Sequence, residues 1–478
     1  MSATYLIICL IISIALVVLF CTKVKMNPAI ALILGSLLLG VLTKVPLNDI
    51  TAADGTVTNG LITVINNGFG NMMGSIGFPI GLGIILGQFV SDTGGATVIA
   101  DKLVTLFPEK YAMYAVGFAG FILSIPVFFD VTFVILIPIG VALMKKLNKG
   151  IGYIVGAISI GAGIAHTLVP PTPNPLVAPE YFGFDLGVMI AAGLLFGIPM
   201  MIISVTIHGM LMKKGLWNAE TDENGNGLNV DELELPEKLP SFGVSLLPII
   251  IPIVLILLNT IVGAVGSTPA WLTFLGQKTT SMLCGTLVAM IIAMKTMGLK
   301  KAEASAANSL HSAGMVFLIT GAGGSFSAVI TSAGVSDAIK NLVSGISGNT
   351  ALILFIAWFL GMAFRQITGS GTVASLTTFA IMQSVTATIA CHPVFLALAC
   401  LDGALFGATV NDSGFWIVSN MAGLNLSGGV KTYTLGQAIA SVVGIILIIV
   451  VGCISCLFKK TDVIQAGVLR HTSWAPVL

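Results

Sequence analysis

Runs of about 20 apolar residues recur along nearly the whole chain, and they limit its fold more than any other feature. A helix needs about 20 predominantly apolar residues to cross a bilayer. Two longer apolar stretches, 111–144 and 350–390, are each interrupted near the middle. Continuous spans are predicted near 4–22, 27–44, 74–90, 151–168, 187–212, 242–264, 276–294, 311–330, 393–410 and 434–458. The sequence therefore predicts an all-α integral membrane protein, with the lipid bilayer as a partner.

The scarcity of charge supports this class and excludes others. Only 9% of the 478 residues are charged, against about 25% in an ordinary soluble protein. The net charge of +1 gives no basic excess for phosphates, so a nucleic-acid partner is excluded. The pair Cys453 and Cys456 has no further cysteine or histidine nearby and is interpreted as two small packing residues on an apolar helix. Neither a metal site nor a cofactor is expected.

Lysines indicate the orientation, because basic loops stay on the cytoplasmic side. The lysine clusters all fall on one side of the membrane only if each interrupted stretch enters and leaves the membrane on the same side, as a re-entrant hairpin. Lys459 and Lys460 fall on the other side and are a mild conflict. The acidic segment 213–241 is predicted to be a cytoplasmic linker. The lysines used are Lys23, Lys25, Lys145, Lys146, Lys149, Lys213, Lys214, Lys295, Lys300 and Lys301.

The two halves of the chain align weakly when one is shifted by about 239 residues, which places 93–104 over 332–343. The hairpin interruptions around 126–132 and 365–371 then coincide. Chance similarity of apolar helices is the alternative, but it does not require helix breakers and polar residues to coincide in both halves. Inverted repeats with broken helices at the midplane are typical of secondary transporters. The predicted organisation is 1–60 N-terminal spans, 61–212 first inverted repeat, 213–241 linker, 242–294 connecting spans, 295–458 second inverted repeat and 459–478 C-terminal tail, with a flexible end from Ala466.

Charged groups at membrane depth are costly and are functional candidates by default. The second interrupted stretch carries Arg365 just before the string T-G-S-G-T, which suits a helix start with exposed backbone N–H groups. A helix N-terminus and a guanidinium together favour binding of a carboxylate. The alternative for Arg365 is an arginine that reaches the lipid headgroups. The predicted carboxylate-binding residues are Arg365, Thr368, Gly369, Ser370, Gly371 and Thr372.

Two further breaks, H-T-L-V-P-P-T-P-N-P at 166–175 and T-V-N-D-S-G-F-W at 409–416, leave backbone groups free at depth. Neutral donors and acceptors in these segments suit substrate hydroxyl groups. They are Thr172, Asn174, Asn411 and Ser413. The candidate proton-coupling residues are Asp130 at the tip of the first hairpin, Asp412, His166 and Asp402. His166 is otherwise a satisfied core histidine, Asp402 a partner for another polar group, and His208, near a predicted span end, is expected at the membrane interface.

The strings G-F-P-I-G-L-G-I-I-L-G (77–87), F-F-D-V-T-F-V-I-L-I-P (128–138), H-T-L-V-P-P-T-P-N-P (166–175) and N-D-S-G-F-W (411–416) resemble the gluconate permease (GntP) family over essentially the full length. The resemblance implies proton-coupled uptake of gluconate or related sugar acids and small hydroxy acids across the bacterial inner membrane. It also implies a fold similar to the ion-transporter superfamily. Members of the family often have other residues at the positions of Asp130, Thr172, Asn174 and Gly371, so the identity of the acid stays open.

The expected function is therefore secondary active transport, with H⁺ as the coupling ion and a small carboxylate as the substrate. A sodium-coupled carboxylate transporter and a D-serine-type permease of the same family are the alternatives, because free carbonyls and hydroxyls at broken helices also suit Na⁺. An intramembrane enzyme is disfavoured, since the sequence carries no H-E-x-x-H motif or cofactor fingerprint. A channel is disfavoured because rings of like charge are absent. A homodimer is one option for the oligomeric state.

Overall fold

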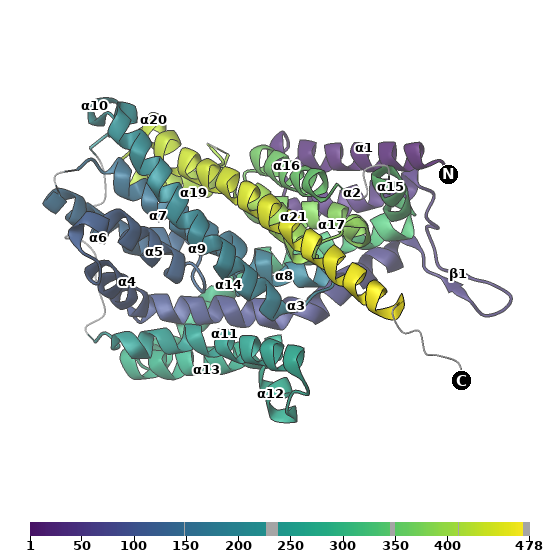
Figure 1. Ribbon diagram of the computed structural model, residues 1–478, viewed down its shortest axis with the longest axis horizontal. Helices are drawn as coiled ribbons and strands as arrows, with labels where there is room; N and C mark the ends of the chain where they lie inside the picture. The colour runs from purple at the N-terminus through teal and green to yellow at the C-terminus, as the bar shows by residue number, and fades with distance from the viewer. Residues whose placement is uncertain (148, 226–237, 345–348, 410, 472–478) are drawn as a thin grey trace.

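The computed structural model describes residues 1–147, 149–225, 238–344, 349–409 and 411–471, and nearly all regular structure among them is helical (Figure 1). The chain begins with α1 (Ala3–Thr22) and α2 (Pro28–Leu42). A two-stranded antiparallel hairpin follows, made of β1 (Ile50–Thr51) and β2 (Val57–Thr58), which the sequence analysis did not predict. These strands are exposed and only two residues long, so no apolar alternation reveals them.

The first half of the repeat begins with α3 and ends at the broken pair α7 and α8. Residues 124–128 separate α5 from α6 as the tip of a helical hairpin, and residues 169–172 interrupt the path from α7 to α8. Pro170 and Pro171 in that interruption cannot donate backbone hydrogen bonds, which explains why the helix stops. The bounds are α3 (Leu61–Asp92), α4 (Gly95–Thr105), η1 (Glu109–Tyr111), α5 (Ala112–Leu123), α6 (Phe129–Leu147), α7 (Gly152–Leu168), α8 (Pro173–Phe182) and α9 (Leu186–Leu211).

The second half repeats this order of elements after a shift of about 240 residues. Gly94 between α3 and α4 and Gly334 between α14 and α15 both have φ of 72°, a left-handed conformation that favours glycine. Residues 369–370 form the second hairpin tip, and the stretch between α18 and α19 forms the second break. The bounds are α14 (Leu299–Ser332), α15 (Val335–Ser344), α16 (Thr350–Thr368), α17 (Gly371–Met382), η4 (Gln383–Thr388), α18 (Val394–Leu405), α19 (Ser413–Met421), α20 (Leu426–Gly429), η5 (Val430–Thr434) and α21 (Leu435–His471).

Between the halves lie η2 (Met212–Leu216), α10 (Ala219–Asp222), α11 (Phe242–Val265), α12 (Ala270–Leu275) and α13 (Lys278–Met297). Helices α11 and α13 pack on each other along one edge of the molecule (Figure 1). The described part of the predicted linker is not simply a solvated connection, because Asp222 in it is fully buried. Residues 226–237 of the linker lie outside the described residues.

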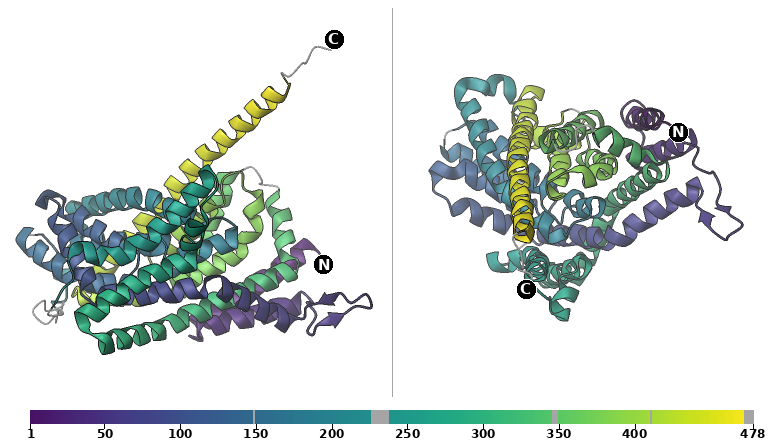
Figure 2. Two further views of the ribbon diagram at one scale, coloured as in Figure 1. Left: turned by 90° about the horizontal axis from the view of Figure 1, so that it is seen from below. Right: turned by 45° about the vertical axis from the view of Figure 1, so that its right-hand side comes forward.

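Helices α3 and α14 are the long central pair that relates the two halves. The end of α3 meets the start of α14, where Ser305 Oγ donates to Asp92 Oδ2 at 2.7 Å. At the other end, Ser325 Oγ late in α14 donates to the carbonyl of Ile65 early in α3 at 2.8 Å. The equivalent helices therefore run antiparallel, which is the relation that an inverted repeat requires. The two views of Figure 2 show both helices passing through the length of the bundle.

The two helices that lead into the breaks form the centre of the bundle. Every residue of α18 and all but two of the residues of α7 are buried. Gly161 of α7 packs so closely on α5 that a Cβ there would lie 1.9 Å from the carbonyl oxygen of Gly117. Small residues at such contacts are how apolar helices approach one another in lipid. His208, in the last turn of α9, is also fully buried within the protein.

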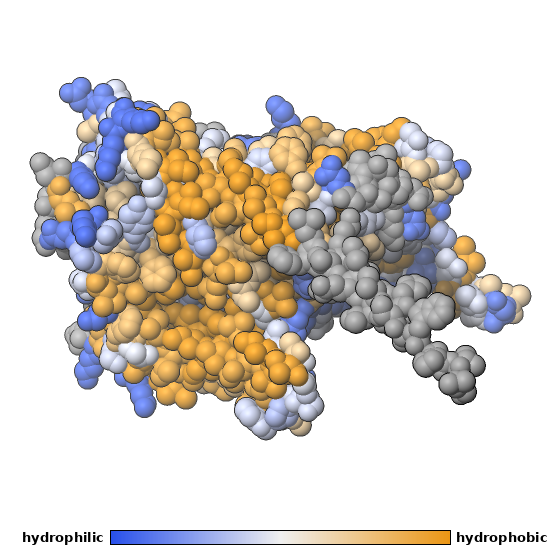
Figure 3. All heavy atoms as spheres, viewed as in Figure 1, coloured by the Kyte–Doolittle hydropathy of each residue, from blue (hydrophilic) through white to orange (hydrophobic). Residues whose placement is uncertain are grey.

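A hydrophobic belt surrounds this centre. Figure 3 shows apolar residues over most of the visible face, with hydrophilic residues gathered towards its ends. Among the described residues, nine helices are long and apolar enough to cross a membrane. The predicted fold class, an all-α membrane protein with two helical hairpins and two broken helices, is confirmed. The C-terminus differs from the prediction: α21 continues to His471, because no strong helix breaker precedes Pro476, and residues 472–478 lie outside the described residues.

Candidate functional site

A cavity of about 240 Å³ lies where the hairpin tips and the two breaks meet. It is smaller than a drug-sized pocket, which has about 300–1,000 Å³, and therefore suits a small metabolite. Four helices present their first residues to it: α6, α8, α17 and α19. The N-terminal end of each helix carries a partial positive charge and free N–H groups. The backbone alone therefore makes the cavity attractive to an anion.

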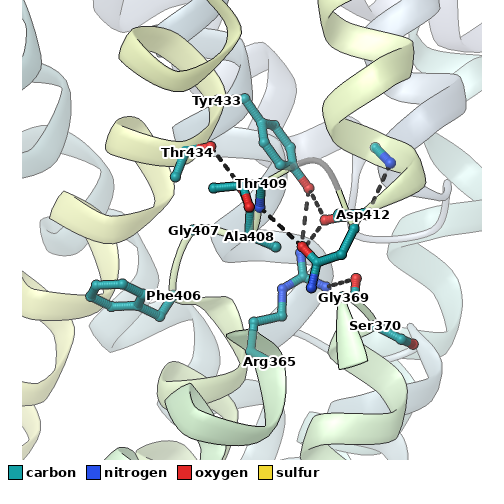
Figure 4. Close-up of polar contacts among 12 residues, drawn as sticks. Arg365, Gly369, Ser370, Phe406, Gly407, Ala408, Thr409, Asp412, Tyr433 and Thr434 are labelled. Carbon is teal, nitrogen blue, oxygen red and sulfur yellow. Dashed lines mark hydrogen bonds and ion pairs between the residues drawn. The ribbon is translucent and has the colours of Figure 1, made fainter. Parts of the chain in front are cut away.

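Arg365 and Asp412 form a buried ion pair at the edge of this cavity, with side chains that are 10% and 9% exposed. Arg365 Nη2 donates to Asp412 Oδ2 at 2.6 Å, and Arg365 Nη1 donates to the carbonyl of Gly369 at 3.1 Å. Tyr433 Oη donates to the same Asp412 oxygen at 2.5 Å and accepts from Arg365 Nη2 at 3.3 Å. Figure 4 shows these three side chains, which come from α16, the second break and η5, pointing towards one another.

Local sequence explains why the second hairpin and the second break fit together. Gly369 has φ of 71°, and a Cβ there would lie 2.1 Å from the carbonyl oxygen of Asn411. Asp412 Oδ1 caps α19 by accepting from Gly414 N at 2.9 Å, as acidic residues commonly do at this position. Asp412 thus has two functions: one carboxylate oxygen holds a helix start and the other holds Arg365.

The first half of the repeat contributes polar groups that make fewer hydrogen bonds among the described residues. Asp130 lies in the first turn of α6, is half-buried and faces Gly414, where a Cβ would be 3.5 Å from its Oδ1. His166 Nδ1 and Asn174 Oδ1 are buried and have no hydrogen-bond partner among the described residues. Buried polar atoms are normally hydrogen-bonded, so these atoms are suited to meet a polar molecule in the cavity.

Ten of the fourteen predicted site residues line the cavity. They are Asp130, His166, Asn174, Arg365, Gly369, Ser370, Gly371, Thr372, Asp412 and Ser413. The other four predicted residues, Thr172, Thr368, Asn411 and Asp402, are not among the residues that line it.

Three of those four use their side chains to hold the backbone. Thr172 Oγ1 donates to the carbonyl of Val169 at 2.8 Å, and Thr368 Oγ1 donates to the carbonyl of Phe364 at 2.8 Å. Asn411 Nδ2 donates to the carbonyl of Gln366 at 2.9 Å. These residues shape the breaks and the hairpin tip.

Asp402 is the fourth, and it faces away from the cavity towards α21. It is fully buried in α18, and neither carboxylate oxygen has a hydrogen-bond partner among the described residues. Gly444 makes room for it, since a Cβ there would lie 2.3 Å from Asp402 Oδ1. A carboxyl group in this position is separate from the Arg365 ion pair.

Tyr433 and Gln437 both line the cavity but are not among the residues predicted from the sequence. Gln437 Oε1 is buried without a hydrogen-bond partner among the described residues. Tyr433 falls just before a predicted span, and Gln437 is an uncharged residue at its start, so a search for charge passed over both. The polar residues at the start of the last apolar run were the available signal. No group of three or more His, Cys, Asp or Glu that could hold a metal ion occurs in the part of the chain that the structure describes.

Comparison with protein families gives a match to the GntP family permeases over residues 5–454. The chain belongs to the GntP permease family. A gluconate permease of Pseudomonas aeruginosa is 31% identical over 94% of this chain and 98% of its own length. A high-affinity gluconate transporter of Escherichia coli is 28% identical over 93% of this chain and 97% of its own length. The expectation of a multi-pass permease of this family is confirmed.

Two solved structures show the same fold at low sequence identity. The Alcanivorax borkumensis YdaH transporter is 13% identical, with a TM-score of 0.64 over 89% of this chain and 98% of its own. Neisseria gonorrhoeae MtrF, of a class of antimetabolite efflux pumps, is 15% identical, with a TM-score of 0.66 over 91% of this chain and 96% of its own. This GntP permease therefore shares a transporter architecture with proteins that have diverged far in sequence.

Proposed function

We propose that this GntP permease takes up gluconate or a related small hydroxy or sugar acid across the bacterial inner membrane, driven by a proton gradient. Relatives named gluconate permeases and transporters support the substrate class. The observation that carries the proposal is the buried guanidinium of Arg365, set in a cavity that four helix N-termini face. A guanidinium and backbone N–H groups are the donors that bind carboxylates in proteins.

The substrate carboxylate takes the place on Arg365 that Asp412 holds in this structure. Arg365 Nη2 donates to Asp412 Oδ2 at 2.6 Å, a geometry that any carboxylate can reproduce. The hydroxyl groups of the substrate then face His166, Asn174 and Gln437, whose buried polar atoms have no partner among the described residues. Hydroxyls on several carbons explain the need for these polar groups beyond the arginine.

The charges in the cavity support proton coupling. Asp130 and Asp412 with Arg365 give a formal charge of −1 when both carboxylates are ionised. An anion that entered alone would bring a second negative charge into a site where charges are costly. A proton that enters with the anion leaves the charge unchanged. Desolvation disfavours the ionised form of a carboxylate, so a carboxylate is a suitable proton carrier.

Asp412 is the first candidate for that carrier. A proton added to its Oδ2 forms an O–H bond and turns this oxygen from an acceptor into a donor. The protonated Asp412 Oδ2 then donates a hydrogen bond to Tyr433 Oη. Arg365 Nη2 no longer bonds to Asp412 and is free to bind the substrate. Asp412 Oδ1 keeps its bond to Gly414 N throughout, so α19 stays capped. Asp130 is the second candidate in the cavity, and Asp402 is a candidate outside it.

Uptake of radiolabelled gluconate into proteoliposomes, with and without an inward proton gradient, tests the proposal. Accumulation that requires the gradient is the expected result. Accumulation without a gradient would contradict the proposed proton coupling, and failure to take up any hydroxy acid would contradict the proposed substrate class. Replacement of Na⁺ by choline should change nothing; a loss of uptake in choline would establish the sodium-coupled alternative.

A further inference from the structure

A second polar cluster lies outside the cavity, where the linker helix α10 docks on α20 (Figure 1). The Asp222 side chain at its centre is fully buried. Lys431 Nζ donates to both Asp222 carboxylate oxygens at 2.9 Å, and Ser427 Oγ donates to Asp222 Oδ1 at 2.7 Å. The backbone N–H of Asn218 donates to Asp222 Oδ2 at 2.8 Å. One carboxylate therefore joins the linker to a segment some 200 residues away in sequence, as Asp222 and Lys431 are 209 apart.

The backbones of the two segments are also joined. Asn425 N donates to the carbonyl of Asp222 at 2.9 Å, and Asn224 N donates to the carbonyl of Gly423 at 2.8 Å. Gly428 allows this approach, because a Cβ there would lie 2.3 Å from the Asp222 carbonyl oxygen. A loop that merely passed over the surface would not need a glycine beneath it and a buried carboxylate within it.

The segment that Lys431 belongs to is the π-helical turn η5 (Val430–Thr434), which connects this cluster to the cavity. π-helical turns are rare and occur frequently at functional sites. His208 Nε2 donates to the carbonyl of Lys431 in this turn at 3.1 Å. Two residues further on, Tyr433 reaches Asp412 and Arg365, and Thr434 Oγ1 donates to the carbonyl of Ala408 at 2.7 Å. The turn is thus held by the linker on one side and used by the cavity on the other.

We propose that Asp222 is a positioning residue for the substrate cavity, acting through Lys431 and η5 to set Tyr433 against the Arg365–Asp412 pair. This inference rests on the proposed function, since it assigns a role to a residue outside the cavity in forming that same site. Tyr433 Oη donates to Asp412 Oδ2 at 2.5 Å, so a shift of η5 that lengthens this distance by more than about 0.5 Å takes it outside the range of O–H···O hydrogen bonds. Asp222 touches neither the cavity nor a substrate in it, and its effect passes entirely through the turn.

Hydrogen exchange of the full-length protein tests the mechanical part without any substrate. The variant is Asp222→Asn, and the matched control is Glu220→Gln, which removes an exposed acid from the same short helix. Asp222→Asn should speed exchange of the amides of η5 and of Gly414 by about tenfold or more, and Glu220→Gln should leave them unchanged. Unchanged exchange at these amides in Asp222→Asn would overturn the proposal.

Uptake kinetics test whether the effect passes through Tyr433. Asp222→Asn should raise the half-saturating gluconate concentration roughly fivefold in the wild-type background and have no further effect in Tyr433→Phe, which is the non-additivity expected of residues that act as a unit. Equal factors in both backgrounds would show that Asp222 only stabilises the fold and would overturn the proposal. If the wild type transported no hydroxy acid, the proposed function would fail, while the exchange measurement would still decide whether Asp222 holds η5.

Discussion

The two halves of the repeat have the same architecture but bring different chemistry to the cavity. The second half supplies Arg365 and Asp412, which are already bonded to each other and to Tyr433. The first half supplies His166 and Asn174, whose buried polar atoms are still without a partner among the described residues. The difference teaches that symmetry of the fold positions the helix ends, whereas a few side chains decide which half holds the ion pair and which half leaves buried polar atoms without a partner among the described residues.

Arg365→Lys should break this comparison most severely. A lysine keeps the positive charge but loses the planar fork that contacts Asp412 Oδ2, Tyr433 and the Gly369 carbonyl together. Losing a hydrogen bond to a charged group costs about 1.5–3 kcal/mol, which corresponds to a loss of roughly 10- to 100-fold in kcat/KM for uptake. Initial rates of gluconate uptake measure the loss. Wild-type uptake in Arg365→Lys would show that fork geometry has no role.

Asp412→Asn should separate binding from coupling. Asparagine can still cap α19 through its side-chain oxygen, but it carries no exchangeable acidic proton. Gradient-driven accumulation should fall by about tenfold or more while exchange of gluconate across the membrane at equal concentrations persists. Measurement of both modes on the same vesicles is decisive. If Asp412→Asn still accumulated gluconate while Asp130→Asn or Asp402→Asn did not, the proton carrier would be the carboxylate whose replacement abolished accumulation.

Asn174→Ala should sharpen the role of the first half with a smaller effect. Loss of a hydrogen bond to a neutral hydroxyl costs about 1 to 1.5 kcal/mol, so the half-saturating concentration should rise about tenfold. Thr172→Val is the matched control, because the Thr172 hydroxyl bonds to Val169 and does not line the cavity. For a substrate analogue without the contacted hydroxyl, wild type and Asn174→Ala should have the same half-saturating concentration. Equal effects of the two variants would contradict the assignment.

The smallest expected effect concerns pH and Asp222. Burial raises the pKa of Asp222, but hydrogen bonds from Asn218 and from the side chains of Lys431 and Ser427 outweigh it, so the pKa is lowered. A lowered pKa means that the stabilisation is fully present above the unfolded value of about 3.9 and is lost as pH falls through the lower folded value. The charged group that faces Asp222 from η5 is Lys431.

Between pH 5 and pH 8 the difference in melting temperature between wild type and Asp222→Asn should therefore be constant, and it should shrink only below about pH 4. Thermal unfolding in detergent across this range measures it. A difference that changed near neutral pH would contradict the lowered pKa of Asp222 in the folded protein.

The fold could be predicted largely from the sequence because lipid cannot hydrogen-bond to the backbone, so each membrane-spanning segment must be an apolar helix. Apolar runs, prolines such as Pro170 and Pro171, and the lysines between runs determine where helices lie and where they stop. The β-hairpin at Ile50–Thr58 and the helical first turns of α14 were not predictable in this way, because neither is a continuous apolar run.

The candidate site was predictable where it uses charge and less so elsewhere. Arg365, Asp412 and Asp130 stand out because charge is rare at membrane depth, and all three line the cavity. Thr172 and Asn411 are neutral hydrogen-bond donors and acceptors, as Ser413 is. Only the direction of each side chain distinguishes a cavity contact from a backbone contact. Tyr433 reaches the site through a π-helical turn that no sequence pattern reveals.

The convergence of four helix starts on one cavity has a consequence for how such permeases diversify. Backbone amides belong to every sequence, so the part of the attraction for an anion that the helix ends supply does not depend on any one side chain. Selection can then exchange the neutral residues of the first half, such as Asn174, and change which acid is carried while the scaffold still accepts acids as a class. A designer who wished to retarget the permease would begin with those residues and leave the helix ends untouched.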